Sequence, residues 1–133
     1  MVISCSHPPG RSVFVKLKIW NQTRSTLLGT EVEVADTSSK RRSGLLNHTC
    51  LADGHGLLII PCEAIHTFGM RFQIDVVFID GKKKVVKLRP SMGRWRIALS
   101  FWANSVLELA AGSIDAARTE VGDQLAFEKL DES

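Results

Sequence analysis

The sequence Ile-Asp-Val-Val-Phe-Ile-Asp-Gly-Lys-Lys-Lys-Val-Val-Lys-Leu occupies residues 74–88 and places two β-forming runs on either side of an Asp-Gly pair. Valine, isoleucine and phenylalanine dominate the first run, as is typical of a strand packed in a hydrophobic core. An Asp-Gly pair favours a type I′ turn, because both central residues of that turn need a positive φ angle. The stretch therefore predicts a β-hairpin that turns at Asp80-Gly81.

Working outward from this hairpin, alternating or continuous apolar runs predict further short strands. They lie at residues 13–20, 27–35, 56–60, 105–110 and 124–129. Residues 90–103 look irregular. There is no βαβ spacing and no internal repeat, so we expect a compact, mainly antiparallel β domain, either a β-barrel or a small sandwich.

Two short helices are expected beside the strands. One covers residues 40–46, behind the capping oxygens of residues 36–39, and the other covers residues 114–119, behind Ser113. A chain of 133 residues suits one hydrophobic core. We expect a single domain at residues 12–130, a flexible leader at 1–11 and a tail at 131–133.

Composition narrows the class of protein. No apolar run reaches the roughly 18 residues that a membrane helix needs, and no secretory signal is visible at the start. Three cysteines without CxxC spacing fit a reducing compartment, so a cytoplasmic location is expected, although a Cys50–Cys62 bridge stays open.

Charge is distributed unevenly along the chain. Residues 81–103 carry seven Lys or Arg and no acid, within a net charge of only +3 for the whole chain. The favoured interpretation is a solvated hairpin that lysines protect from edge pairing; the alternative is an anion-binding face beside Trp95 and Trp102. The small net charge does not favour a nucleic-acid partner.

Several segments together resemble the DUF192 family of uncharacterised bacterial and archaeal proteins. These segments lie at residues 42–46, 54–62, 65–80, 106–112 and 121–125, so the resemblance spans about residues 13–130. It implies a small β-rich fold and no activity. The family's motif positions fall on Arg42, Gly44, Leu45, Leu46, Phe68, Met70, Arg71, Ile74 and Asp75. Gln73 stands where the family often has proline.

Asp75 is the most informative polar residue, because its neighbours in the strand are core-forming. A carboxylate removed from water must be paired or hydrogen-bonded. We expect main-chain N–H groups or an arginine fork, from Arg42 or Arg71, to hold it. The leading hypothesis is a small binding module with an Arg/Asp-organised cleft for an anionic or sugar-like ligand. Its ligand-binding residues would be Arg42, His66, Phe68, Met70, Arg71 and Asp75.

Two alternatives use the spacing of Cys62, His66 and Met70. The first is a Cys/His-dependent hydrolase or thiol enzyme, and the second is a metal site for zinc or copper(I), to which His48 and Cys50 could add ligands. Packing of cysteine and methionine in the core explains the same residues more simply. No catalytic residue, metal or cofactor is therefore assigned, and phosphate-loop and dinucleotide fingerprints are absent.

Overall fold

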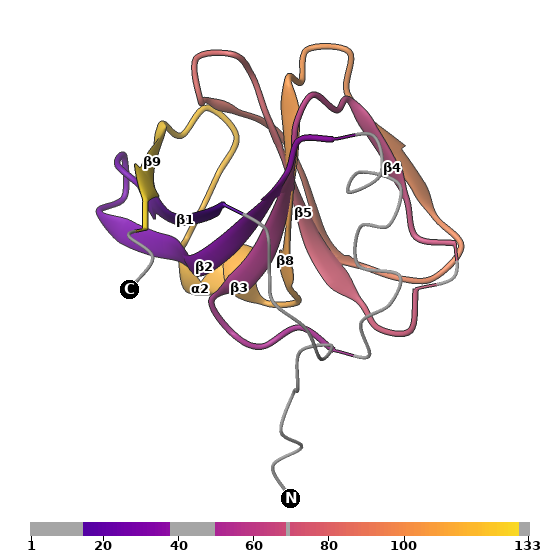
Figure 1. Cartoon of the computed structure of the whole chain (residues 1–133). Coiled ribbons are helices and arrows are strands. Elements are labelled where there is room, and N and C mark those ends of the chain that lie inside the picture. Colours follow the sequence, from indigo (N-terminus) through magenta and orange to yellow (C-terminus); the bar gives the residue numbers. More distant parts are fainter. Residues whose placement is uncertain (1–14, 38–49, 69, 131–133) are drawn as a thin grey trace, which may run out of the picture.

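The computed structural model describes residues 15–37, 50–68 and 70–130, and most of them form one curled sheet (Figure 1). The strand order is β6-β5-β8-β3-β2-β1-β9, and β2–β3 is the one parallel pair within this order. The strands are β1 (Lys16–Asn21), β2 (Thr26–Ala35), β3 (His55–Ile59), β5 (Ile74–Ile79), β6 (Val85–Met92), β8 (Ser105–Ala110) and β9 (Leu125–Lys129). The expected mainly β architecture is confirmed.

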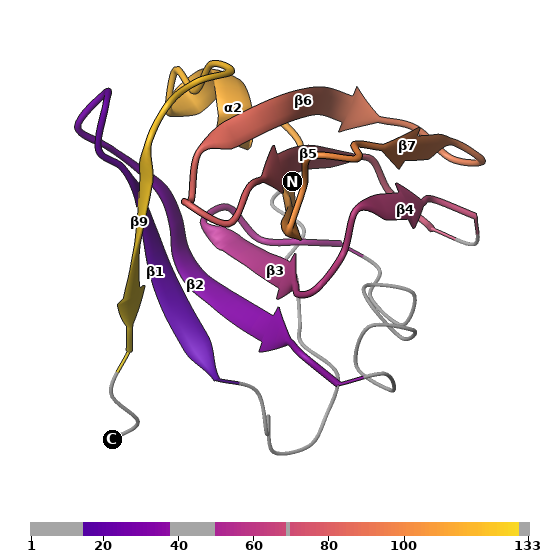
Figure 2. The ribbon, with the colours of Figure 1, turned by 90° about the horizontal axis from the view of Figure 1, so that it is seen from above.

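The two edges of this sheet approach each other at one end, so the curl forms a half-barrel (Figure 2). An isolated antiparallel bridge joins Lys84, just before β6, to Gln124, just before β9. Beside it, the Val85 N–H donates to the Asp123 carbonyl oxygen at 2.9 Å, and the Gly122 N–H donates to the Val85 carbonyl oxygen at 2.8 Å. These bonds satisfy main-chain groups that two open sheet edges would leave unpaired.

Hydrophobic cores lie on both faces of the central strands. The first core fills the inside of the curl and includes Ile19, Leu58, Val77, Leu107 and Leu125. The second core lies on the opposite face and includes Leu57, Met70, Val76, Phe78 and Val106. Successive side chains of a strand point to opposite faces, so β5 and β8 contribute to both cores and are buried throughout.

A small two-stranded sheet covers the second core. It pairs β4 (Ala64–His66) with β7 (Ile97–Leu99), antiparallel. Ile65 and Ala98 point into the core, while the residues on either side of them are exposed. The sequence did not predict these two strands, because three residues each give too short a pattern to recognise.

The predicted hairpin is confirmed, but its turn is not type I′. The residue with positive φ is Lys83, at 63°, and not Gly81. The Lys83 N–H donates to the Asp80 carbonyl oxygen at 3.1 Å, and the Asp80 carboxylate accepts from the Lys82 and Lys84 N–H groups at 2.8 and 2.9 Å. The Asp80 side chain thus stabilises a longer loop that ends in a left-handed residue.

The helices differ from the sequence prediction. The first expected helix, at residues 40–46, lies outside the described residues. The second is α2 (Ser113–Ala116), which is shorter than predicted and is not capped by Ser113. Gly112 occupies the N-cap with φ 96°, and the Ser113 hydroxyl instead donates to the Ala110 carbonyl oxygen at 2.6 Å. No helix in the described part of the chain is long and apolar enough to cross a membrane.

The cysteines settle one open alternative. Cys50 is disulfide-bonded, whereas Cys62 is a thiol whose Sγ donates to the Ala64 carbonyl oxygen at 3.1 Å. The Cys50–Cys62 bridge is therefore excluded.

Close packing of β3 against β8 gives a test of the sheet. A Cβ added at Gly56 would lie 2.6 Å from the Glu108 carbonyl oxygen and 2.7 Å from Leu109 Cδ2. We expect Gly56→Ala to lower the free energy of unfolding by about 2 kcal/mol, because one of the contacts is to backbone that cannot rotate away. Urea denaturation measures this, with Gly81→Ala as the control, since a Cβ there meets nothing within 4 Å. Equal stability of the two variants would contradict the packing.

Candidate functional site

Asp75 lies in β5 with 1% of its surface exposed, and its carboxylate is held entirely by main-chain donors. The Ser91 N–H donates to Oδ1 at 2.7 Å. The N–H groups of Gly112 and Ile114 donate to Oδ2 at 3.1 and 2.8 Å. The cradle is therefore made of amides, and no described guanidinium bonds this carboxylate.

This cradle joins three separate elements. The register between β5 and β6 shifts near Ser91, whose φ is 47°, and such a bulge turns an N–H out of the strand ladder. Asp75 accepts that N–H and also caps the start of α2, where Gly112 has no side chain to do so. The residue thus has a full structural role, and its oxygens are already occupied by N–H groups of the chain.

Replacing the Asp75 carboxylate should destabilise the fold. In Asp75→Asn one acceptor oxygen becomes an NH₂ group that faces buried N–H donors, so we expect a loss of about 3 kcal/mol in the free energy of unfolding. Urea denaturation at neutral pH measures this loss. Asp115→Asn on the exposed side of α2 makes the same charge change and should cost little. A similar loss in both variants would mean that the cradle contributes nothing specific.

The other predicted ligand-binding residues do not gather around Asp75. Asp75 lies on the face of β5 that carries Val77, in the first core, whereas Met70 is buried in the second core on the opposite face. His66, Phe68 and Arg71 are exposed near the small sheet. Arg42 lies outside the described residues. The structure therefore groups three of the six and separates Met70 and Asp75 from them.

The exposed group continues into an aromatic contact between two loops. The ring centroids of His66 and Phe68 are 5.2 Å apart, and those of Phe68 and Trp95 are 5.4 Å apart. Trp95 is 70% exposed, and Ile97, paired with His66 across the small sheet, is also exposed. We call His66, Phe68 and Trp95 the aromatic edge. Tilted rings at these distances are in favourable contact.

Thr67 holds this edge in place from beneath. Its side chain is fully buried, and its Oγ1 donates to the Gly93 carbonyl oxygen at 2.6 Å and accepts the Arg96 N–H at 2.8 Å. The Thr67 N–H also donates to the Arg96 carbonyl oxygen at 2.8 Å. Between these anchors Trp95 adopts φ 60°, a conformation that is rare for a bulky residue. The turn is therefore fixed while the indole ring faces solvent.

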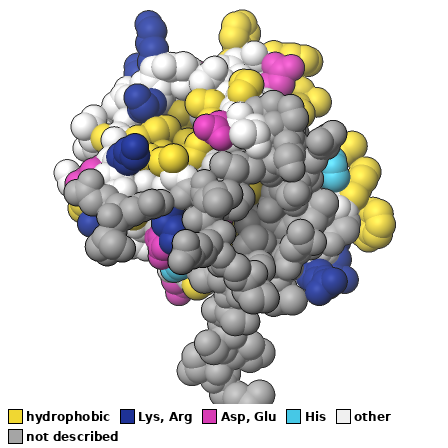
Figure 3. Space-filling view, viewed as in Figure 1, with side chains coloured by type: hydrophobic (Ala, Val, Ile, Leu, Met, Phe, Trp, Pro, Cys, Tyr) yellow, Lys and Arg dark blue, Asp and Glu magenta, His cyan; other side chains and the backbone are white. Residues whose placement is uncertain are grey.

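Arginines flank Trp95 of the aromatic edge in the sequence. Arg71, Arg94 and Arg96 are all exposed, and Arg94 Nη2 donates to the Arg71 carbonyl oxygen at 3.0 Å. Residues 81–103, which supply the Trp95 side of the edge, contain no acid. Figure 3 shows hydrophobic, histidine and basic side chains gathered along the margin of the molecule that β4 occupies in Figure 1. The site therefore combines apolar ring surface with positive charge.

The thiol and metal alternatives need Cys62, His66 and Met70 to share one site, and the structure places these residues in different environments. His66 points outward and contacts Phe68, whereas Met70 is buried and Cys62 packs against the second core. Within residues 15–37, 50–68 and 70–130 no group of three or more His, Cys, Asp or Glu could hold a metal ion. His48 lies outside these ranges.

A cleft of about 480 Å³ lies between Arg24, Asp75 and α2. Arg24, at its rim, is held by two acids, because Arg24 Nε donates to Asp123 at 3.1 Å and Arg24 also pairs with Glu120. Burial would raise the pKa of Asp123, but hydrogen bonds from Asn21, the Glu120 N–H and Arg24 hold that pKa below its usual value. This network connects the β1–β2 turn to the segment before β9 and has a structural role.

One buried acid, Glu108, was not among the residues predicted from the sequence. It lies in β8 on the second-core face, opposite Leu57 in β3 and Val76 in β5, with 6% of its surface exposed. Its Oε2 has no hydrogen-bond partner among the described residues, and burial raises its pKa to about 7. Such a carboxyl group loses its proton at a higher pH than an exposed glutamate does.

Glu108 should make stability depend on pH. Because its pKa is higher in the folded chain than in the unfolded chain, stability should fall as pH rises from about 4.5 to above 7. Glu108→Gln removes the titrating group. The free energy of unfolding of the variant, relative to that of the wild type, should therefore rise by about 3 kcal/mol across this pH window. Above the window the difference should stay constant. Urea unfolding of both proteins from pH 4.5 to 8.5 measures the difference. A difference that does not change with pH would show that Glu108 does not titrate as inferred.

Comparisons with known proteins agree with the fold. The DUF192 family model, described as "Uncharacterized ACR", matches residues 19–127. A UPF0127 protein from Thermococcus sibiricus is 32% identical, over 84% of this chain and 75% of its own, and one from Pyrococcus abyssi is 36% identical, over 82% and 96%.

Two crystal structures have the same fold. One, described as a "putative transcription regulator" from Sinorhizobium meliloti, has a TM-score of 0.76 at 21% identity and covers 89% of this chain and 98% of its own. The other, a protein of unknown function from Novosphingobium aromaticivorans, has a TM-score of 0.70 at 17% identity, with coverage of 91% and 93%. At these identities the likeness concerns the fold alone.

Proposed function

This chain belongs to the DUF192 family, whose description names no activity, and we propose from its surface that it is a small binding module for an anionic, sugar-like ligand. The binding site is the aromatic edge of His66, Phe68 and Trp95 together with Arg71 and Arg94. The sequence predicts an anionic or sugar-like ligand, and the proposal narrows this to a ligand with both properties. It centres the site on the small sheet, away from Asp75.

The single observation that carries this proposal is the way Trp95 is presented. Its backbone adopts φ 60° and is fixed by the Thr67 hydrogen bonds, yet its ring is 70% exposed. Such a conformation costs of order 1–3 kcal/mol and persists only where the surroundings impose it. Burial of the indole ring in the core does not explain it. A ligand that packs on the ring gives the arrangement a use.

Two features of the edge indicate the chemistry of this ligand. Exposed rings offer flat apolar surfaces on which a sugar ring can pack, and the neighbouring guanidinium groups can bind carboxylate or sulfate through paired hydrogen bonds. No acid lies within residues 81–103 to compete for them. An acidic saccharide provides both an apolar ring face and negative charge.

Oligogalacturonate tests the proposal, with an uncharged galacto-oligosaccharide as the comparison. We expect isothermal titration calorimetry to show saturable binding of the anionic oligomer, weaker at high salt, and much weaker binding of the neutral one. Trp95→Ala should raise the Kd at least tenfold, as is typical of an anchoring aromatic residue.

Trp102→Ala is the matched control, because Trp102 is also a largely exposed tryptophan, at 81% against 70% for Trp95, but lies in a different loop. It should leave the Kd unchanged. The proposal fails if oligogalacturonate does not bind, or if the Trp95 and Trp102 variants bind it equally well.

A further inference from the structure

A second exposed aromatic pair lies beyond the other end of β7, in the loop before β8. Phe101 and Trp102 are 79% and 81% exposed. The Ala103 N–H donates to the Ser100 carbonyl oxygen at 3.1 Å, which closes a turn with Phe101 and Trp102 at its two central positions. Those positions usually carry Gly, Pro, Asn, Asp or Ser, so neither turn chemistry nor core packing accounts for two large rings there.

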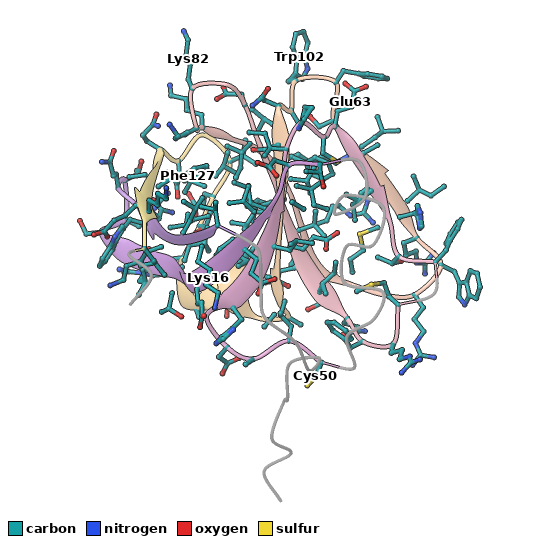
Figure 4. All side chains as sticks on the ribbon, in the orientation of Figure 1. Lys16, Cys50, Glu63, Lys82, Trp102 and Phe127 are labelled. Atoms are coloured by element: carbon teal, nitrogen blue, oxygen red, sulfur yellow. The ribbon has the colours of Figure 1, made fainter. Side chains whose placement is uncertain are left out.

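The base of this turn is anchored to the rest of the fold. The Ser100 N–H donates to the Glu63 carbonyl oxygen at 2.8 Å, and the Asn104 N–H donates to the Ile79 carbonyl oxygen at 2.8 Å. Because Ile79 is the last residue of β5, the second bond places the aromatic turn beside the β5–β6 loop. Figure 4 shows Lys82 and Trp102 projecting from the same end of the molecule.

The β5–β6 loop supplies positive charge beside these rings. Lys82, Lys83 and Lys84 are all exposed there, and Lys83 Nζ lies 5.4 Å from the centre of the Phe127 ring, on the β9 side of the loop. Along the chain the nearest acid is Asp80, whose carboxylate accepts two N–H groups of its own loop. We define the tip surface as Lys82, Lys84, Phe101 and Trp102. It combines two apolar rings with two cations, and Glu63 is the exposed acid next to it.

We propose that this tip surface docks the protein on an anionic lipid bilayer. Tryptophan favours the headgroup region of a membrane, where its ring is apolar and its N–H can still bond, and each nearby lysine adds about fivefold in affinity for an anionic surface. Phe101 and Trp102 are adjacent at the crest of one turn, which suits insertion into an interface. A single-stranded nucleic acid instead needs a groove with successive stacking platforms.

The tip surface is separate from the saccharide site, so bilayer docking and saccharide binding can be tested independently. Co-sedimentation of the full chain with vesicles tests it. We expect binding to vesicles of phosphatidylcholine and phosphatidylglycerol in a 3:1 ratio, little binding to phosphatidylcholine alone, and loss of binding at high salt. Lys82→Gln with Lys84→Gln should weaken binding about 25-fold, and Phe101→Ser with Trp102→Ser at least tenfold.

Trp95→Ala is the control for the aromatic pair and should bind vesicles like the wild type. Equal binding to neutral and anionic vesicles would overturn the proposal, as would an unchanged affinity in the Phe101/Trp102 variant. Binding of the wild type to polyuridylate but not to vesicles would also overturn it, because it would assign the same surface to a nucleic acid. Circular dichroism of each variant establishes that the fold is intact.

Discussion

The structure depends on the double-sided burial of its central strands. Every residue of β5 and β8 is buried, because cores lie on both faces of the sheet. A polar side chain in either strand must then find its partners inside the protein or lose its charge more readily, as the raised pKa of Glu108 in β8 indicates. Asp75 does so by collecting N–H groups that a bulge in β6 and the start of α2 leave without ladder partners. The Asp75 carboxylate, which comes from a regular strand, thus fixes the bulge in β6 and the start of α2 in place.

The strands that carry strong local patterns could be predicted from the sequence, and those that rest on tertiary contacts could not. Residues 105–110 were predicted with the bounds of β8, because an apolar run between turn residues is a local signal. The strands β4 and β7 exist only because Ile65 and Ala98 reach the second core together. Pro90 made its region look irregular, but β6 is an edge strand, where the missing N–H costs no ladder bond.

The candidate site residues also divide into those with a local sequence signal and those that depend on tertiary contacts. A buried acid in an apolar strand was a sound signal at Asp75, and the same rule applied to Val-Leu-Glu-Leu-Ala at residues 106–110 would have found Glu108. No rule of sequence identifies which aromatic residues stay exposed, because aromatic side chains are more often buried. Trp95 combines an exposed ring with a left-handed backbone, and the residues on either side of it are held by Thr67, which lies 26 and 29 positions away from them along the chain.

The two proposed surfaces share one support, the small sheet of β4 and β7. The inner side chains of the small sheet are anchored in the second core, while its outer side carries His66 and Ile97. The aromatic edge lies at one end of β7 and the aromatic turn at the other, each fixed by main-chain hydrogen bonds. A rigid spacer keeps the two at a constant separation, so a protein held at a bilayer by the turn would present the edge in one fixed orientation. The curled sheet anchors the small sheet, and the small sheet sets the positions of the two proposed surfaces.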